Sequence, residues 1–119
     1  LIHPHTLIDF DVYNQFLDYA DGLLQETQLD GVFQIASFHP NYQFGGTDID
    51  DAENYTNRSP YPLLHILREA SLDAVLETTE HTDQIPVRNI ALMNEMGAAR
   101  LKQMLSACLD NSPESSKEI

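Results

Sequence analysis

Three histidines are the residues in this sequence best suited to metal binding or proton transfer. His3 and His5 flank Pro4 near the start of the chain, and His39 precedes a second proline, Pro40. Imidazole nitrogens bind Zn²⁺ and similar divalent ions, and an open coordination position allows a bound water to be activated. The sequence therefore predicts a metal site at His3, His5 and His39, or general-base catalysis by His39 or His3. The alternative is structural, because imidazoles can also hydrogen-bond loop carbonyl groups.

Carboxylates in the next segment could complete such a site. Asp50 and Asp51 lie in an acidic stretch between positions 48 and 53, and either could orient a catalytic histidine or bind the metal. The stretch does not match a calcium-binding loop, because Ala52 replaces an oxygen ligand and Glu53 replaces the required glycine. The sequence contains no HExxH pair and no GxSxG turn, so neither a zinc-protease helix nor a serine triad is predicted.

A second polar cluster surrounds the first basic residue of the chain. Ser59-Pro60 is typical of a helix start, and we expect a helix from there to about Glu69. The free amides of a helix N-terminus bind phosphate or carboxylate, and an arginine adds a bidentate contact. The cluster therefore predicts a site for a small anionic ligand, although its arginines could instead neutralise the acidic loop. The candidate ligand-binding residues are Asn54, Thr56, Asn57, Arg58 and Ser59, with His65 and Arg68 three residues apart on one face of the expected helix.

The elements that would position these residues form a strand-helix-strand pattern. Residues 1–3 and 32–38 are expected to be short strands, and an amphipathic helix with Asp9 as its N-cap is expected over 9–27. A helix of this length between two strands is typical of a parallel crossover, which brings the carboxyl ends of both strands to one edge. We therefore predict an α/β fold with a small, mainly parallel sheet, the two His-Pro pairs side by side and a ligand cleft at that edge.

The remainder of the chain is predicted to be a long loop followed by helices. Residues 41–59 form the loop, whose aromatic side chains suggest that it packs down as the wall of a cleft. A short helix is expected after Ser71, and a longer helix over 83–109 with Gly97 as a break, which makes the C-terminal half helical. We expect one domain over 1–109 and a disordered polar tail over 110–119.

The charge of the chain limits its partners. The formal net charge is -13, and residues 1–57 contain ten acidic and no basic side chains. This charge disfavours binding to nucleic acids or anionic membranes and favours metal cations or a basic partner. The alternative function is therefore a non-catalytic acidic interaction module in which the histidines are structural. The single cysteine, Cys108, and the absence of long apolar runs are consistent with a cytoplasmic protein.

The same motifs carry a family resemblance. The sequences HPHTL at 3–7, SFHPNYQF at 37–44 and DDAENYTNRSPYP at 50–62, followed by LHILREAS at 64–71, are similar to a bacterial family of unknown function. Members of that family are expected to be longer, with an upstream region that carries a further strand and a Cys-Pro motif, so a cysteine from that region could complete the histidine site. The resemblance implies no reaction.

Overall fold

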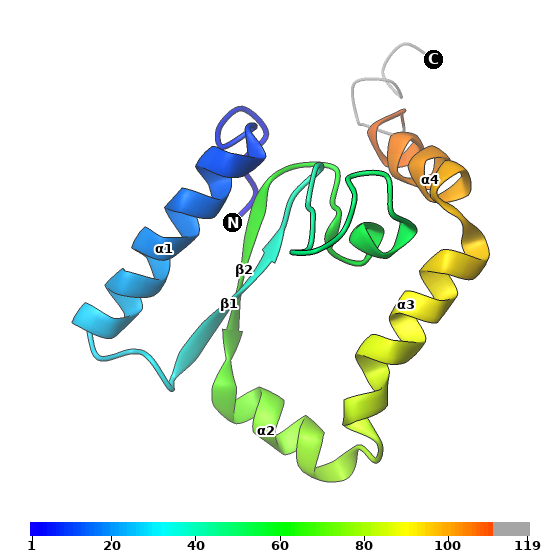
Figure 1. The fold of residues 1–119 in the computed structure, drawn as a ribbon. Helices are drawn as coiled ribbons and strands as arrows, with labels where there is room; N and C mark the ends of the chain where they lie inside the picture. The colour runs from blue at the N-terminus through cyan, green and yellow to red at the C-terminus, as the bar shows by residue number, and fades with distance from the viewer. Residues whose placement is uncertain (111–119) are drawn as a thin grey trace, which may run out of the picture.

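The structure is a computed structural model that describes residues 1–110. The elements in chain order are α1 (Phe10–Glu26), β1 (Phe33–Phe38), a 3-10 helix η1 (Ala52–Asn57), β2 (Leu63–Arg68), α2 (Glu69–Thr78), η2 (Thr82–Gln84), α3 (Ile85–Met96) and α4 (Ala98–Asp110). Helix α1 lies on one side of the β1–β2 pair, while α3 and α4 return on the other side, beyond the loop that contains η1 (Figure 1).

Helix α1 forms as its sequence predicts. The side chain of Asp9 accepts a hydrogen bond of 3.0 Å from the backbone amide of Val12, which caps the first turn. An apolar stripe of alternating three- and four-residue spacing then runs along the helix, and its members are buried or half-buried. This stripe consists of Phe10, Tyr13, Leu17, Ala20 and Leu24.

The two strands pair in the antiparallel direction. Phe38 is opposite Leu63 in the register, and Phe33 is opposite Arg68. Ile2 makes an isolated antiparallel bridge to Leu63, so residues 1–3 lie along the other edge of β2. The prediction of a mainly parallel sheet is therefore wrong. β2 lies between β1 and residues 1–3, so it also separates the two His-Pro pairs that were expected side by side.

The segment predicted as a helix over 60–69 is strand β2. Its backbone hydrogen-bonds to β1 on one edge, and on the other the Leu64 amide donates to the Leu1 carbonyl oxygen. Ser59 does not cap a helix, because its hydroxyl donates to the carbonyl oxygen of Tyr61 at 2.7 Å. A six-residue apolar run fits a strand as well as a helix, and here the neighbouring strand decided the outcome.

Tyr13 connects α1 to both strands. Its side chain is fully buried, and its hydroxyl donates to the carbonyl oxygen of Leu63 at 2.7 Å and accepts from the amide of Phe38 at 3.0 Å. Burial raises the pKa of the Tyr13 phenol above its ordinary value, so the hydroxyl keeps the proton that it donates. The tyrosine therefore fixes the helix against the end of β1 and the start of β2.

The helical C-terminal half follows the prediction apart from β2. Gly97, at φ +83°, ends α3 and separates it from α4, where the sequence placed a break. Both α3 and α4 pack against η1. The predicted tail over 110–119 lies outside the described residues, except that Asp110 is the last residue of α4.

The described part of the chain buries few hydrophobic side chains. Within residues 1–110, only Tyr13, Leu64 and Leu101 are buried hydrophobic residues, and many large apolar side chains are exposed. No helix in this part of the chain has the length and hydrophobicity that a membrane crossing requires. The apolar side chains are therefore distributed over open faces and grooves, in addition to a small core.

Candidate functional site

Asn54 organises the loop that follows β1. Its side chain is fully buried, and its Oδ1 accepts from the amide of Phe44 at 2.9 Å and from the hydroxyl of Thr47 at 3.0 Å. Its Nδ2 donates to the carbonyl oxygen of Asp48 at 2.7 Å. Through these three hydrogen bonds, the Asn54 side chain fixes the conformation of the loop over 44–48.

Arg58 also stabilises this loop, through hydrogen bonds to backbone groups on either side of residues 44–48. Its Nε donates to the carbonyl oxygen of Tyr42 at 3.0 Å, and its Nη2 donates to that of Ile49 at 2.7 Å. The guanidinium carbon also lies 4.4 Å from the centre of the Tyr55 ring, within the range of a cation-π contact. Arg58, predicted to bind an anion, thus directs two of its donor groups to backbone carbonyl oxygens.

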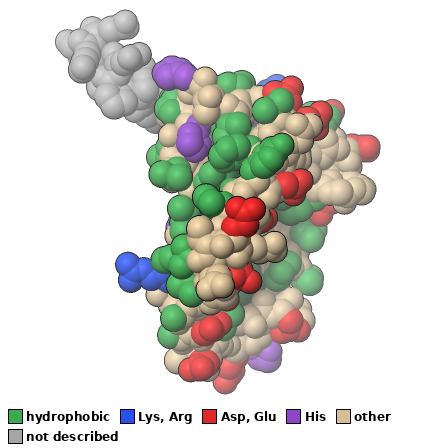
Figure 2. All heavy atoms as spheres, turned by 90° about the vertical axis from the view of Figure 1, so that its left-hand side faces the viewer, with side chains coloured by type: hydrophobic (Ala, Val, Ile, Leu, Met, Phe, Trp, Pro, Cys, Tyr) green, Lys and Arg blue, Asp and Glu red, His purple; other side chains and the backbone are tan. Residues whose placement is uncertain are grey.

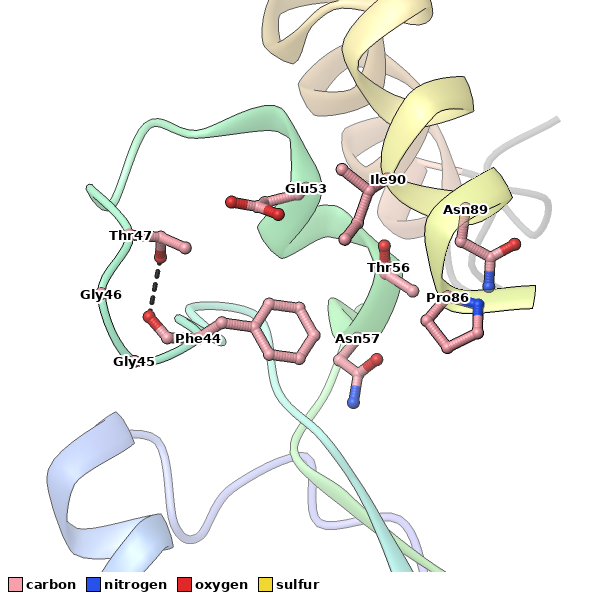
Figure 3. Close-up of a pocket in the computed structure, with 10 residues that line it drawn as sticks. All are labelled: Phe44, Gly45, Gly46, Thr47, Glu53, Thr56, Asn57, Pro86, Asn89 and Ile90. Carbon is pink, nitrogen blue, oxygen red and sulfur yellow. Dashed lines mark hydrogen bonds between the residues drawn. The ribbon is translucent and has the colours of Figure 1, made fainter. Parts of the chain in front are cut away.

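A pocket of about 590 Å³ opens between this loop and α3 (Figure 3). The Phe44 ring forms one apolar wall, and Pro86 and Ile90 of α3 form part of the other. The loop glycines and Thr47 make the rim. The volume lies within the range of about 300 to 1,000 Å³ that is usual for small-molecule sites. The full lining is Phe44, Gly45, Gly46, Thr47, Glu53, Thr56, Asn57, Pro86, Asn89 and Ile90.

Polar groups in the pocket come from η1 and α3. Two of them, Thr56 and Asn57, are among the predicted ligand-binding residues. The Oγ1 of Thr56 is buried and has no hydrogen-bond partner within the described residues. Asn57 instead uses its Nδ2 to donate to the carbonyl oxygen of Ser37 at 3.1 Å. Glu53 is the charged side chain of the lining, and Asn89 contributes an amide from α3. The pocket therefore combines apolar walls with hydrogen-bonding groups and one acidic group.

His39 does not line this pocket, and its side chain is fully buried beside the first turn of α1. Its Nδ1 accepts from the amide of Asn41 at 3.0 Å, so Nε2 carries the proton and donates to the carbonyl oxygen of Leu7 at 2.9 Å. The imidazole also packs against the Phe10 ring at 5.2 Å and the Tyr13 ring at 4.9 Å between centroids. Burial lowers the pKa of His39, which favours the neutral ring. Both nitrogens are thus engaged by backbone groups, as in the structural alternative.

The other predicted metal ligands do not gather around His39. His5 is exposed, while His3 is half-buried with an Nε2 atom that is buried and unpartnered. Within residues 1–110, no group of three or more His, Cys, Asp or Glu side chains is arranged to hold a metal ion. The structure thus offers no coordination set for the proposed divalent ion in this part of the chain.

The remaining predicted site residues are dispersed. Asp51 accepts a hydrogen bond of 2.9 Å from the amide of Asp48, and Asp50 is exposed beside Arg58 at a smaller pocket of about 350 Å³. His65 and Arg68 lie on β2, where residues three apart point to opposite faces. The shared helix face predicted for them is therefore wrong, and residues 60–68 form no helix whose N-terminal amides could hold an anion.

Sequence reasoning missed the half of the pocket that α3 supplies. The sequence predicts only a helix over this region, and nothing in the spacing of Pro86, Asn89 and Ile90 marks them as pocket residues. The signal available in the sequence was Asn89, a polar residue with the apolar Pro86 and Met93 at helical spacing on either side, and in the structure its side chain is half-buried. Phe44 was expected to pack down, and its ring does so, at 4.9 Å from that of Tyr42.

Comparison with known proteins identifies the family. Residues 1–103 match the family described as "Protein of unknown function (DUF1415)". The match covers most of the chain, and the protein therefore belongs to this family. No curated protein and no solved structure shows significant similarity to the chain.

Proposed function

We propose that the protein binds a small organic molecule in the pocket between the loop over 44–57 and α3. The observation that carries this proposal is the unpartnered hydroxyl of Thr56, which is buried at the pocket wall. Buried polar groups nearly always have a hydrogen-bond partner, so a ligand that supplies one would remove an energetic cost. The apolar walls formed by Phe44 and Ile90 would contribute affinity through burial.

The charge of the lining favours a neutral or positively charged ligand. Glu53 is acidic, and among residues 1–110 no lysine, arginine or histidine lines the pocket. A carboxylate near a partly desolvated ligand attracts ammonium groups and repels carboxylates and phosphates. The proposal thus differs from the anionic ligand that the sequence suggested, and it assigns Arg58 to holding the loop.

A fragment screen tests the proposal. We expect neutral and cationic aromatic fragments to shift the amide NMR signals of residues 44–47, 53–57 and 86–90. Glu53→Gln should lower the affinity for cationic fragments about tenfold and leave the affinity for neutral fragments nearly unchanged. Glu95→Gln is the matched control, because it removes the same charge from an exposed residue that does not line the pocket.

Ile90→Trp supplies a second test, since the larger side chain would occupy the pocket from α3. Ile90 is 41% exposed, so the substitution should be tolerated by the fold. Fragment binding should be lost while the far-UV circular dichroism stays unchanged. Fragments that bind Ile90→Trp as well as they bind the wild type, or that shift signals only outside the three segments, would contradict the proposal.

A further inference from the structure

A second apolar stripe runs along α1, separate from the stripe that faces the sheet. Its residues follow the four-three-four spacing of a helix-packing seam, and all are exposed. Tyr19 is 77% exposed and Leu23 is 60% exposed, whereas Ala20 and Leu24, which follow them on the inner stripe, are half-buried. This outer stripe consists of Val12, Phe16, Tyr19 and Leu23. Large apolar side chains in such a continuous row are typical of a surface that packs against another helix.

The outer stripe borders a groove between α1 and the sheet. The groove has a volume of about 570 Å³. Phe16, Tyr19 and Leu23 line it from the helix, and Leu64 and Ile66 line it from β2. Helix α1 therefore covers only part of this face of the sheet, and the space beside it is apolar on both the helix side and the sheet side.

The charges around the groove are acidic. Asp18 and Glu26 lie in its lining, and the whole of α1 carries four acidic and no basic side chains. The face of the molecule on which α1 lies shows hydrophobic side chains interspersed with Asp and Glu, and few Lys or Arg side chains (Figure 2). A partner for this groove must therefore match an apolar centre and a negatively charged border.

We propose that the groove between α1 and β2 binds an amphipathic helix of another protein, whose apolar stripe is bordered by lysine or arginine. The apolar stripe would pack between the outer stripe of α1 and Ile66 of β2, with the buried Leu64 at the floor of the groove, as in helix-in-groove recognition. Lysines and arginines beside that stripe would face Asp18 and Glu26. This is the acidic interaction module that the sequence left as an alternative, with its docking surface and the chemistry of its partner now specified.

Charge also disfavours a second copy of this chain as the occupant. Asp18 lies at the midpoint of α1, so a symmetric antiparallel pair of these helices would bring the two Asp18 carboxylates close to the twofold axis. All other charged side chains of α1 are acidic as well. Like charges at a helix-helix contact oppose association, so the partner must supply the positive charge.

Synthetic helical peptides test this proposal. The probe is about 18 residues long, with leucine at heptad a and d positions and lysine at the flanking positions. One control peptide has glutamate in place of lysine, and another has the probe's composition with its leucines dispersed. We expect saturable binding of the lysine peptide, no measurable binding of the glutamate peptide, and binding at least about tenfold weaker for the dispersed peptide.

Protein variants locate the binding surface. Tyr19→Ala combined with Leu23→Ala should lower the affinity for the lysine peptide about tenfold or more, because both side chains line the groove. The matched control is Val87→Ala with Leu92→Ala, which removes two exposed apolar side chains from α3. Methyl NMR signals of Ile35 and Leu64 in the wild-type protein give an independent readout, since both residues line the groove.

Four outcomes would overturn the proposal. The dispersed peptide could bind as tightly as the probe, or the α3 control could lose as much affinity as the α1 variant, either of which would mean non-specific attraction between opposite charges. The methyl signals could stay unchanged when the peptide binds. Sedimentation could show a dimer that the Tyr19 and Leu23 substitutions dissociate, which would make a second copy the occupant of the groove.

Discussion

The hydroxyl of Tyr13 donates a hydrogen bond of 2.7 Å to the carbonyl oxygen of Leu63 at the first residue of β2. The same hydroxyl accepts from the amide of Phe38, the last residue of β1. A side chain from a helix thus bridges the backbones of β1 and β2 at the end of their antiparallel pairing. This arrangement holds three elements together in a fold with few buried hydrophobic side chains.

Tyr13→Phe is expected to destabilise the protein by about 1 to 3 kcal/mol, because it leaves the amide of Phe38 without the partner it has at present. The midpoint of urea unfolding measures this change. Tyr19→Phe is the matched control, since Tyr19 is 77% exposed and lies on the same helix, and it should stay within about 0.5 kcal/mol of the wild type. Equal effects of the two substitutions would show that the buried hydroxyl is not important.

The burial of His39 predicts a specific pH dependence of the folding stability. Burial lowers the pKa of its imidazole in the folded protein below the ordinary value of 6.5, so the unfolded chain binds the proton more readily. The contribution of His39 to stability is therefore complete above about pH 7 and is lost as the pH falls from 6.5 through the folded pKa. Wild-type stability should fall more steeply between pH 7.5 and 5.5 than the stability of His39→Gln.

Urea unfolding at several pH values between 7.5 and 5.5 measures this difference. His81→Gln is the control, because His81 is exposed, and its pH dependence should follow that of the wild type. A wild-type protein and a His39→Gln variant with parallel pH profiles would contradict the assignment of His39 as a buried neutral ring.

Asn54→Asp should open the loop that forms the pocket rim. The new carboxylate would place an oxygen against the carbonyl oxygen of Asp48, where Nδ2 now donates, and would bury a charge. We expect a loss of about 2 to 4 kcal/mol in unfolding free energy and faster hydrogen exchange over residues 44–51. Asn14→Asp, which makes the same chemical change at an exposed position of α1, should leave both quantities nearly unchanged.

Two glycine substitutions should change the stability of the protein in opposite directions. Gly22 lies inside α1 with no atom within 4 Å of an added Cβ, so Gly22→Ala should stabilise the protein by about 0.5 to 1 kcal/mol. Gly97 has φ +83°, which alanine adopts only with strain, so Gly97→Ala should destabilise it by about 1 kcal/mol or more. Thermal unfolding of both variants measures the difference, and stabilisation by Gly97→Ala would contradict the described break between α3 and α4.

The candidate site was only partly accessible from the sequence. The polar cluster predicts Thr56 and Asn57 as ligand-binding residues, and both line the pocket. Asn54 was named as a ligand residue, but its three hydrogen bonds build the loop. Asn89 lies more than thirty positions downstream of Thr56, and local spacing carries no information on which helix will pack against η1.

Sequence alone determined the elements whose signals are local. Helix α1 was predicted because its cap, Asp9, and its apolar spacing lie within one segment, and the break at Gly97 was predicted because glycine tolerates positive φ. Tertiary structure decided the conformation of residues 63–68 and the direction of the sheet. A short apolar run is compatible with helix or strand, and only hydrogen bonds to residues distant in sequence, here β1 and the segment around Ile2, favour the strand.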